Sequence, residues 1–312
     1  MKAVFLDRAT FSPTTSLPAP QGITEWQVFE RTPYQAEIII ERLQGAHIAI
    51  TNKVPLTREI LSALPDLKLV QITATGLNNI DLEAAKALGI TVYNVAGYSS
   101  ISVAEHTLMM ALSLARGLLP YHQQSLDGTW QQDGRFCLTD LPILDLYGKT
   151  WGIVGGGAIG QEVAKRAQAF GMKVIFAERQ SALPRNEHYV RPEELLQRAN
   201  IISLHCPLTP ETQNWINAER LAHCKQQPLI LNMARGGVVD SQAVVDALNA
   251  GKIGGYGTDV FVNEPPHDDE PLLSLKHHPR VLFTPHNAWA SENAQSALWR
   301  ILTEQVQQFI QG

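Results

Sequence analysis

Several features that mark particular protein classes are scarce or missing in this sequence. Its 312 residues include three cysteines, widely spaced and without a CxxC pair, so neither a disulfide framework nor a zinc site is indicated. No apolar stretch approaches the roughly 18 residues of a membrane span. No Lys/Arg-rich run offers a nucleic-acid footprint, and the net charge is −5. Residues 1–7 resemble a buried strand closed by an acid, not a signal peptide. We therefore expect a cytoplasmic protein without nucleic-acid or membrane partners.

Short apolar runs alternate with helical segments twice along the chain. At roughly 150 residues per domain, this length predicts about two domains. Continuous apolar strands separated by helices are typical of parallel sheets covered on both faces. The expected strands are 3–6, 48–50, 69–72, 91–93, 150–154, 174–177, 201–204, 229–231, 257–261 and 281–283. The expected helices include 36–43, 82–88, 158–170, 241–250 and 291–310.

A long helix is expected over Ser102–Leu119, between the two alternating regions. Ser102 and Glu105 have the spacing of a capping box. Apolar residues surround this helix on nearly all sides, which predicts burial between domains or between subunits. The following segment, Gln123–Leu146, is richer in Gly, Asp and Gln, and we expect an irregular arm.

A glycine-rich loop follows the strand 150–154 and opens a helix. In the run GGGAIG, Gly155 permits a tight turn, Gly157 lets the backbone approach a pyrophosphate, and Gly160 lets helix and strand pack closely. The helix N-terminus adds free N–H groups and partial positive charge, and Ala158 and Ile159 would approach the phosphates through their backbone. The strand–turn–helix context favours a dinucleotide site over a simple glycine turn.

Glu178 ends the next strand, eighteen positions after Gly160. A carboxylate there accepts hydrogen bonds from the adenosine ribose and repels a 2′-phosphate, which favours NAD. Arg179 is adjacent, and a guanidinium is able to hold that phosphate, so NADP remains the alternative cofactor.

Six ordered motifs resemble the D-isomer-specific 2-hydroxyacid dehydrogenases, collinearly from about residue 70 to residue 291. They are ATGLNNID at 74–81, the GGGAIG loop, HCPLT at 205–209, NMARGG at 232–237, GTDVF at 257–261 with Glu264-Pro265, and TPH at 284–286. Within this family, the stretches ATGLNNIDL and PHNAWAS are most similar to those of glycerate dehydrogenases (hydroxypyruvate reductases).

The resemblance implies a catalytic Arg, Glu and His, which fall on Arg235, Glu264 and His286. Reduction of a 2-keto acid requires the same residue types. A guanidinium binds the planar substrate carboxylate in bidentate fashion, and a His is the natural proton donor near neutral pH. A paired carboxylate favours the protonated imidazole and fixes its orientation. Each residue also has an ordinary structural alternative, but each follows a predicted strand, where ligand crevices lie in open α/β sheets.

The resemblance implies weaker roles for other residues. Thr75 and Gly76 would hold the substrate carboxylate through backbone N–H groups, and the alternative is a plain turn. Cys206 and Pro207 would line the adenine side, or pack at a strand end. Trp289 would shape the substrate pocket or pack at a domain junction. Met233, Ala234 and Asp259 would flank the nicotinamide half, with Asp259 bonded to its carboxamide or supporting Arg235. The polar run 267–270 is expected to be a solvated surface, and we predict no metal site.

Together these features predict an α/β protein of two doubly wound parallel-sheet domains. A Rossmann dinucleotide-binding domain, residues 101–288, is inserted in a flavodoxin-like substrate-binding domain, residues 1–100 and 289–312, with the active site between them. The expected function is NAD(H)-dependent hydride transfer with a small D-2-hydroxy acid or 2-keto acid, preferably D-glycerate/hydroxypyruvate or glyoxylate. Alternatives are D-lactate or phosphoglycerate oxidation, and a non-catalytic NAD-sensing module. The family is typically dimeric, so we expect a homodimer.

Overall fold

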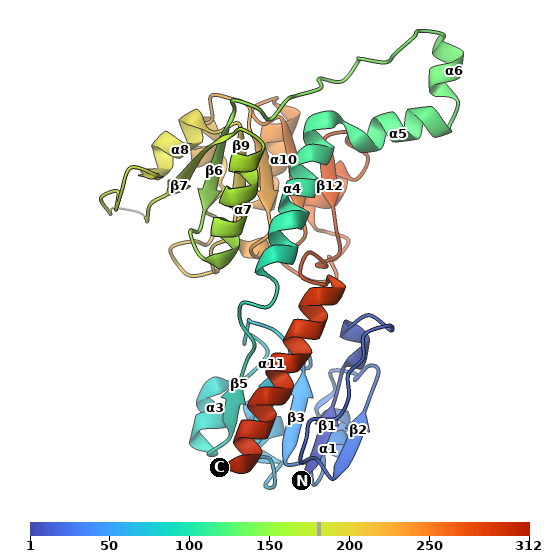
Figure 1. Ribbon diagram of the computed structural model, residues 1–312, viewed down its shortest axis with the longest axis vertical. Coiled ribbons are helices and arrows are strands. Elements are labelled where there is room, and N and C mark those ends of the chain that lie inside the picture. Colours follow the sequence, from blue (N-terminus) through green and yellow to red (C-terminus); the bar gives the residue numbers. More distant parts are fainter. Residues whose placement is uncertain (180–181) are drawn as a thin grey trace. The chain divides into compact units, whose positions relative to one another are not determined.

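The computed structural model describes residues 1–179 and 182–312 and divides into two compact units (Figure 1). Unit 1 comprises residues 1–99 and 289–312, and unit 2 comprises residues 100–288. Each unit has its own parallel β-sheet with helices packed against it. This confirms the α/β class that the alternation of apolar runs and helical segments predicts.

Unit 1 contains a five-stranded sheet with the strand order β2-β1-β3-β4-β5, all parallel. In chain order this is the 2-1-3-4-5 arrangement of flavodoxin-like sheets. The strands are β1 (Lys2–Phe5), β2 (Glu25–Val28), β3 (Ile48–Thr51), β4 (Leu69–Ile72) and β5 (Thr91–Tyr93). The helices are η1 (Arg8–Thr10), α1 (Ala36–Leu43), α2 (Arg58–Ser62), α3 (Leu82–Ala87) and α11 (Glu292–Gln311).

The two faces of this sheet are covered by different helices because successive strand residues point to opposite sides. In β1, Val4 belongs to the core shared with α1, α2 and α3. Ala3 and Phe5 belong instead to the core shared with α11, where Phe5 lies 5.4 Å from Trp299, ring centre to ring centre. The C-terminal helix therefore completes the fold of the first hundred residues.

Unit 2 contains a seven-stranded parallel sheet with the order β12-β11-β10-β9-β6-β7-β8. Counted from β6, this is the 3-2-1-4-5-6 order of dinucleotide-binding domains with one added strand. The strands are β6 (Thr150–Val154), β7 (Lys173–Ala177), β8 (Tyr189–Val190), β9 (Ile201–Leu204), β10 (Leu229–Asn232), β11 (Gly255–Thr258) and β12 (Val281–Phe283). The helices are α4 (Ser100–Arg116), α5 (Leu118–Leu126), α6 (Thr129–Asp133), α7 (Ala158–Ala169), α8 (Pro192–Arg198), α9 (Ala218–Ala222), α10 (Ser241–Asn249), η2 (Gly236–Val238) and η3 (Pro271–Leu275).

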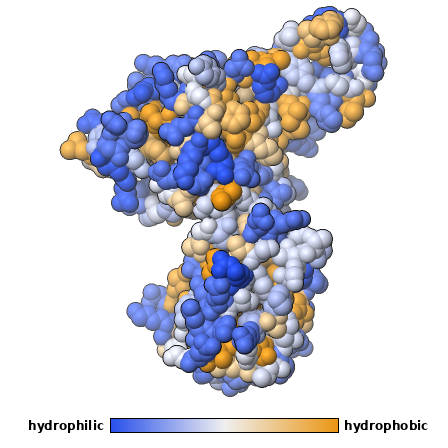
Figure 2. Space-filling model, in the orientation of Figure 1, coloured by the Kyte–Doolittle hydropathy of each residue, from blue (hydrophilic) through white to orange (hydrophobic). Residues whose placement is uncertain are grey.

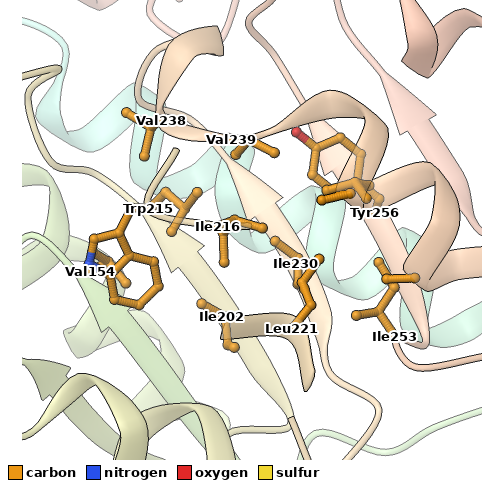
Figure 3. Close-up of a cluster of buried hydrophobic side chains, with 14 of the residues drawn as sticks. Val154, Ile202, Trp215, Ile216, Leu221, Ile230, Val238, Val239, Ile253 and Tyr256 are labelled. Carbon is orange, nitrogen blue, oxygen red and sulfur yellow. The ribbon is translucent and has the colours of Figure 1, made fainter. Parts of the chain in front are cut away.

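The unit 2 sheet is also covered on both faces. Helices α4 and α7 pack against one another over β6, β7, β10 and β11 (Figure 1). The opposite face carries a large apolar core built from strand residues such as Ile202, Ile230 and Tyr256 and from the segments α8 to α10 (Figure 3). The central strands β6, β9 and β10 are buried on both faces, which explains why they are mostly apolar runs.

The expected long helix differs from the structure in three respects. It begins at Ser100, so Ser102 is not its N-cap, and the Ser102 hydroxyl instead donates to the Ala288 carbonyl at 2.6 Å. It ends at Arg116, because Gly117 adopts a left-handed conformation with φ of 61° and starts α5. It is not buried all round, since Met109 is exposed. The arm predicted as irregular contains the end of α5 and all of α6.

None of the helices in the described ranges is long and apolar enough to cross a bilayer.

Candidate active site

Three adjacent strands of unit 2 present the predicted catalytic residues at their carboxyl ends. Arg235 comes three residues after β10, Glu264 six residues after β11, and His286 three residues after β12. Because these strands are parallel neighbours in the sheet, their following loops emerge at the same edge. The topology alone therefore brings the three loops together.

His286 and Glu264 form a direct pair. The Nδ1 atom of His286 lies 2.6 Å from Oε2 of Glu264, and Oε1 of Glu264 accepts the backbone N–H of Phe261 at 3.1 Å. An ionised carboxylate only accepts, so the pair requires the proton on Nδ1. The His286 and Glu264 side chains are 28% and 32% exposed, which leaves the pair accessible to a ligand. His286 has φ of 52°, an uncommon conformation for a non-glycine residue and one found at functional sites.

Asp259 holds the loop that carries His286. Its buried carboxylate accepts the Thr284 hydroxyl at 2.5 Å, the Asn287 N–H at 3.0 Å and the Ala288 N–H at 2.9 Å. One of the two roles expected for Asp259 was to support Arg235. Within residues 1–179 and 182–312, none of its hydrogen bonds goes to Arg235. The structure gives Asp259 the role of fixing residues 284–288.

Helix α4 contributes a further link to the same loop. Nε2 of His106 lies 3.0 Å from the Thr284 hydroxyl, which donates its only proton to Asp259, so His106 carries a proton on Nε2. Burial lowers the pKa of His106 despite the nearby Asp259 carboxylate, and the imidazole is therefore neutral at physiological pH.

Arg235 begins a tight turn at the end of β10. Asn232 donates from Nδ2 to the Arg235 carbonyl at 3.0 Å, and Arg235 donates from Nη1 to the Ala234 carbonyl at 2.7 Å. The next residue, Gly236, lies directly against the Phe261 backbone, since an added Cβ would be 2.1 Å from the Phe261 carbonyl carbon. The Arg235 turn is thus packed on the loop that leads to Glu264.

The glycine loop lies where the strand order reverses, between β6 and β9, and its geometry fits a dinucleotide phosphate. An added Cβ on Gly155 would be 2.6 Å from the His205 carbonyl carbon, and one on Gly160 would be 2.1 Å from the Gly155 carbonyl oxygen. Gly157 faces open space and caps α7 without any side-chain hydrogen bond. The first turn of α7, which begins at Ala158, therefore offers free N–H groups to an anion.

Gly156 has a steric requirement of its own. An added Cβ would be 2.1 Å from the hydroxyl of Tyr189, whose ring stacks on Phe176 at 5.1 Å. The dinucleotide fingerprint leaves this position variable, so only the structure identifies the constraint.

Glu178 follows β7 and is buried, as a ribose-binding carboxylate would be, but it has a partner that the sequence did not indicate. Arg185 donates to it from Nε at 2.8 Å and from Nη2 at 2.5 Å. The backbone N–H groups of Arg179 and Arg185 complete its surroundings at 2.9 and 3.2 Å. The Arg185 guanidinium lowers the pKa of Glu178 to about 2.

The remaining predicted residues of unit 2 lie around the same sheet edge. Cys206, Met233 and Ala234 are buried, Ile159 is half-buried, and Pro207 and Ala158 are exposed. Cys206 and Pro207 follow β9, beside the glycine loop, because the Cβ of a side chain at Gly155 would also lie 2.7 Å from the Cys206 nitrogen. These positions stay predictions for the adenine and nicotinamide halves.

Thr75, Gly76 and Trp289 belong to unit 1. The turn after β4 is fixed at Thr75, whose hydroxyl donates to the Val95 carbonyl at 3.0 Å and whose carbonyl accepts from Asn94 Nδ2 at 2.7 Å. Trp289 makes edge-to-face contacts with Phe11 at 5.9 Å and Tyr98 at 6.0 Å, so it packs in an aromatic cluster of unit 1.

Sequence reasoning did not single out the contacts of Arg185, Thr284, Gly236, Gly156 and His106. Thr284 and Gly236 lie inside the family motifs TPH and NMARGG, and membership of a motif is the one sequence signal that pointed to them. Arg185 lies seven residues beyond Glu178 in a polar loop, and no local pattern indicates its pairing. In the described part of the chain, no group of three or more His, Cys, Asp and Glu side chains is placed to hold a metal ion.

The three cysteines are free and differ in environment. Cys137 is exposed, whereas burial raises the pKa of Cys206 and of Cys224 to about 11. Because the thiolate is the reactive form, we expect one fast-reacting thiol with Ellman's reagent at pH 8 and two slow ones. Raising the pH from 8 to 9 should accelerate the slow pair, because the thiolate fraction of both buried thiols increases. Cys137→Ser should abolish the fast phase, and a fast phase that survives this substitution contradicts the assignment.

Comparisons with known proteins agree with this geometry. Residues 108–288 match the family described as D-isomer specific 2-hydroxyacid dehydrogenase, NAD binding domain. A glycerate dehydrogenase of Methylorubrum extorquens is 42% identical, covering 100% of this chain and 96% of that protein. A hydroxypyruvate reductase of Blautia hydrogenotrophica is 37% identical, covering 100% and 98%.

Solved structures include a D-lactate dehydrogenase of Aquifex aeolicus complexed with NAD and lactic acid. It superimposes with a TM-score of 0.80 at 28% identity, covering 100% of this chain and 96% of that one. The predicted resemblance is thereby confirmed. The chain belongs to the D-isomer specific 2-hydroxyacid dehydrogenases, which are oxidoreductases acting on CH–OH groups, and its residues 108–288 are an NAD-binding domain of that family.

Proposed function

We propose that this protein is an NAD(H)-dependent reductase of a small 2-keto acid, with hydroxypyruvate (reduced to D-glycerate) or glyoxylate as preferred substrate. The observation that carries the proposal is the 2.6 Å His286–Glu264 pair on the loops beside the Arg235 turn. The names of the two full-length relatives, a glycerate dehydrogenase and a hydroxypyruvate reductase, support the choice of substrate. D-Lactate and phosphoglycerate oxidation are the alternatives within the family.

Arg235 has the properties of the substrate cation. Its guanidinium is permanently charged and can bind a carboxylate through two parallel hydrogen bonds. A hydrogen bond from Nη1 to the Ala234 carbonyl holds the side chain in place. The same charge stabilises negative charge that develops on the ketone oxygen as it is reduced.

His286 is the proposed proton donor. Glu264 holds Nδ1, which leaves Nε2 to deliver a proton to the ketone oxygen during reduction or to remove one from the hydroxyl during oxidation. The negative charge of Glu264 stabilises the imidazolium and fixes the ring orientation. The nicotinamide cofactor supplies the hydride when bound, and the glycine loop with the first turn of α7 would hold its phosphates.

The other assignments remain proposals with narrower support. The fixed turn at Thr75 and Gly76 is suited to binding a carboxylate through its N–H groups. Unit 1 is the proposed substrate-binding domain and unit 2 the dinucleotide-binding domain. The residues proposed to contact the cofactor are Gly155, Gly157, Ala158, Ile159, Gly160, Glu178, Cys206, Pro207, Met233, Ala234 and Asp259. Trp289 is a proposed substrate-side residue.

Arg235→Ala tests the mechanism. We expect kcat/KM for hydroxypyruvate to fall by roughly 10²- to 10³-fold, because two charge-assisted hydrogen bonds are lost. Arg235→Lys should retain part of the activity, since it keeps the charge without the bidentate geometry. The control is Arg300→Ala, which removes an exposed pair with Glu304 on α11. Wild-type kcat/KM in Arg235→Ala would refute the role.

NADH oxidation with hydroxypyruvate, glyoxylate and pyruvate ranks the substrates, and no turnover with any of them would reject the proposed reductase activity.

Gly236→Ala tests the contact between the Arg235 turn and the loop leading to Glu264. An added methyl group must displace backbone at Phe261, and misplacement of catalytic groups by about 1 Å can cost on the order of 10²-fold in rate. We expect kcat to fall at least tenfold with the fold intact by circular dichroism. Gly237→Ala is the matched control, because the atoms nearest to its methyl group belong to the flexible side chain of Leu208, at 3.1 Å. Equal rates in the two variants would count against the contact.

We further propose a homodimer located in the cytoplasm. Helices α5 and α6 and the following segment form an arm of unit 2 (Figure 1). This arm carries several exposed apolar side chains (Figure 2). They are Leu118, Leu119, Leu126, Trp130 and Phe136. Apolar groups gathered on an extension of unit 2 favour a subunit contact. Three free cysteines are consistent with a reducing compartment.

Sedimentation velocity tests the dimer. We expect twice the mass of one chain for the wild type and the mass of a single chain for Leu126→Lys/Trp130→Glu, which places charges on the arm. Leu88→Lys, at an exposed position of unit 1, is the control and should stay dimeric. A double variant with unchanged mass would rule out the arm as the contact.

A further inference from the structure

The turn after β4 in unit 1 has its carbonyl groups bound and its N–H groups unused. The Ala74 carbonyl accepts the Val95 N–H at 3.0 Å. The Thr75 carbonyl accepts Nδ2 of Asn94 at 2.7 Å. Within residues 1–179 and 182–312, no hydrogen bond uses the N–H of Thr75 or of Gly76, and Thr75 is exposed. An ionised carboxylate only accepts hydrogen bonds, so this turn has the polarity that a carboxylate ligand requires.

The Asn94 side chain sets the direction of one of these N–H groups. A trans peptide unit is planar, and its C=O and N–H point in opposite directions. The Thr75 carbonyl and the Gly76 N–H belong to one such unit, so the hydrogen bond from Asn94 directs the Gly76 N–H away from the segment after β5. The bond from Val95 to the Ala74 carbonyl does the same for the Thr75 N–H. Of these two bonds, only the one from Asn94 depends on a side chain.

The C-terminal helix holds Asn94 in turn. Helix α11 lies across one face of the unit 1 sheet (Figure 1). Gln305 of this helix donates from Nε2 to the Asn94 carbonyl at 3.1 Å. Its Oε1 accepts from Nε2 of Gln71, a fully buried residue of β4, at 3.0 Å. Gln305 therefore connects the strand that leads into the turn with the residue that fixes the turn.

We propose that Asn94 is a positioning residue for the carboxylate of the 2-keto acid, and that Gln305 extends this support to the C-terminal helix. The proposal rests on the proposed function, in which Thr75 and Gly76 bind that carboxylate. Asn94 acts through the Thr75 peptide unit and does not contact the substrate itself. Without it, the Thr75 carbonyl is no longer held away from an incoming anion, and the Gly76 N–H loses its direction.

Asn94→Ala tests the proposal through the separate kinetic constants. We expect KM for hydroxypyruvate to rise about tenfold with kcat within about threefold of the wild type, because one hydrogen bond that supports uniform substrate binding is lost. KM for NADH should be unchanged, since Asn94 belongs to unit 1. A purely structural role would instead lower the fraction of active enzyme, and therefore kcat, without altering KM for the keto acid.

Gln305→Glu provides a second variant should Asn94→Ala not fold, as judged by circular dichroism. A glutamate keeps the acceptor for Gln71 and lacks the donor for the Asn94 carbonyl. We expect KM for hydroxypyruvate to rise about threefold, because the support is lost one step further from the turn. Gln308→Glu is the matched control, since it adds the same charge at an exposed position of α11, and it should behave as the wild type.

Titration of the NADH-bound protein with oxamate gives a measurement without turnover, followed through the amide N–H signals of Thr75 and Gly76 in nuclear magnetic resonance spectra. Both signals should shift in the wild type, and Asn94→Ala should raise the required oxamate concentration about tenfold. The proposal is overturned if neither signal shifts in the wild type, if Asn94→Ala and Gln305→Glu keep wild-type KM and oxamate affinity, or if Gln308→Glu shows the same loss. Shifts that weaken in Asn94→Ala, in a protein that reduces no keto acid, would reject the reductase and leave this inference standing.

Discussion

The hydrogen bonds of the buried Asp259 carboxylate are the interaction on which the position of the His286 loop depends. A charge removed from water must be fully hydrogen-bonded, and Asp259 meets this need with the Thr284 hydroxyl and the N–H groups of Asn287 and Ala288. These partners flank His286, whose backbone has φ of 52°. Satisfying the charge therefore fixes an unusual backbone conformation, and that conformation directs the imidazole toward Glu264.

The strand order explains why the hydrogen bonds of Asp259 are sufficient to position the His286 loop. In unit 2, the loops after β10, β11 and β12 emerge at the edge of the sheet that also carries the glycine loop after β6. The strand order reverses between β6 and β9, which remain parallel, and nucleotides bind outside such a switch point. Gly155 packs against the backbone that follows β9, and Gly236 packs against the backbone that follows β11. Close backbone contacts between neighbouring loops thus hold the glycine loop and the loops that carry Arg235 and Glu264 to one sheet.

Sequence patterns predicted the local part of this arrangement and not the distant partners. Apolar runs located the strands of both sheets except β2, which is largely exposed, and the two-residue β8. Motif spacing placed Arg235, Glu264 and His286 after strands. Patterns misplaced the start of α4, since Ser102 bonds a carbonyl 186 positions away and not its own helix. The Asp259 anchor and the Arg185–Glu178 pair were equally hidden. No sequence pattern indicates which acceptor a backbone N–H group or a half-exposed arginine will bind.

Three carboxylates in unit 2 differ in their roles because their hydrogen-bond partners differ, although all three are acidic side chains of the same chemistry. Asp259 is buried, and its carboxylate accepts the Thr284 hydroxyl and two backbone N–H groups, so it holds the loop that carries His286. Glu178 is buried and saturated by Arg185 and two N–H groups, so its charge is cancelled at the cofactor end. Glu264 is about one-third exposed, with one oxygen on a backbone N–H and the other on His286. Of the three, the Glu264 arrangement leaves a carboxylate hydrogen-bonded to an imidazole, and this is why we propose acid–base chemistry for Glu264 and His286.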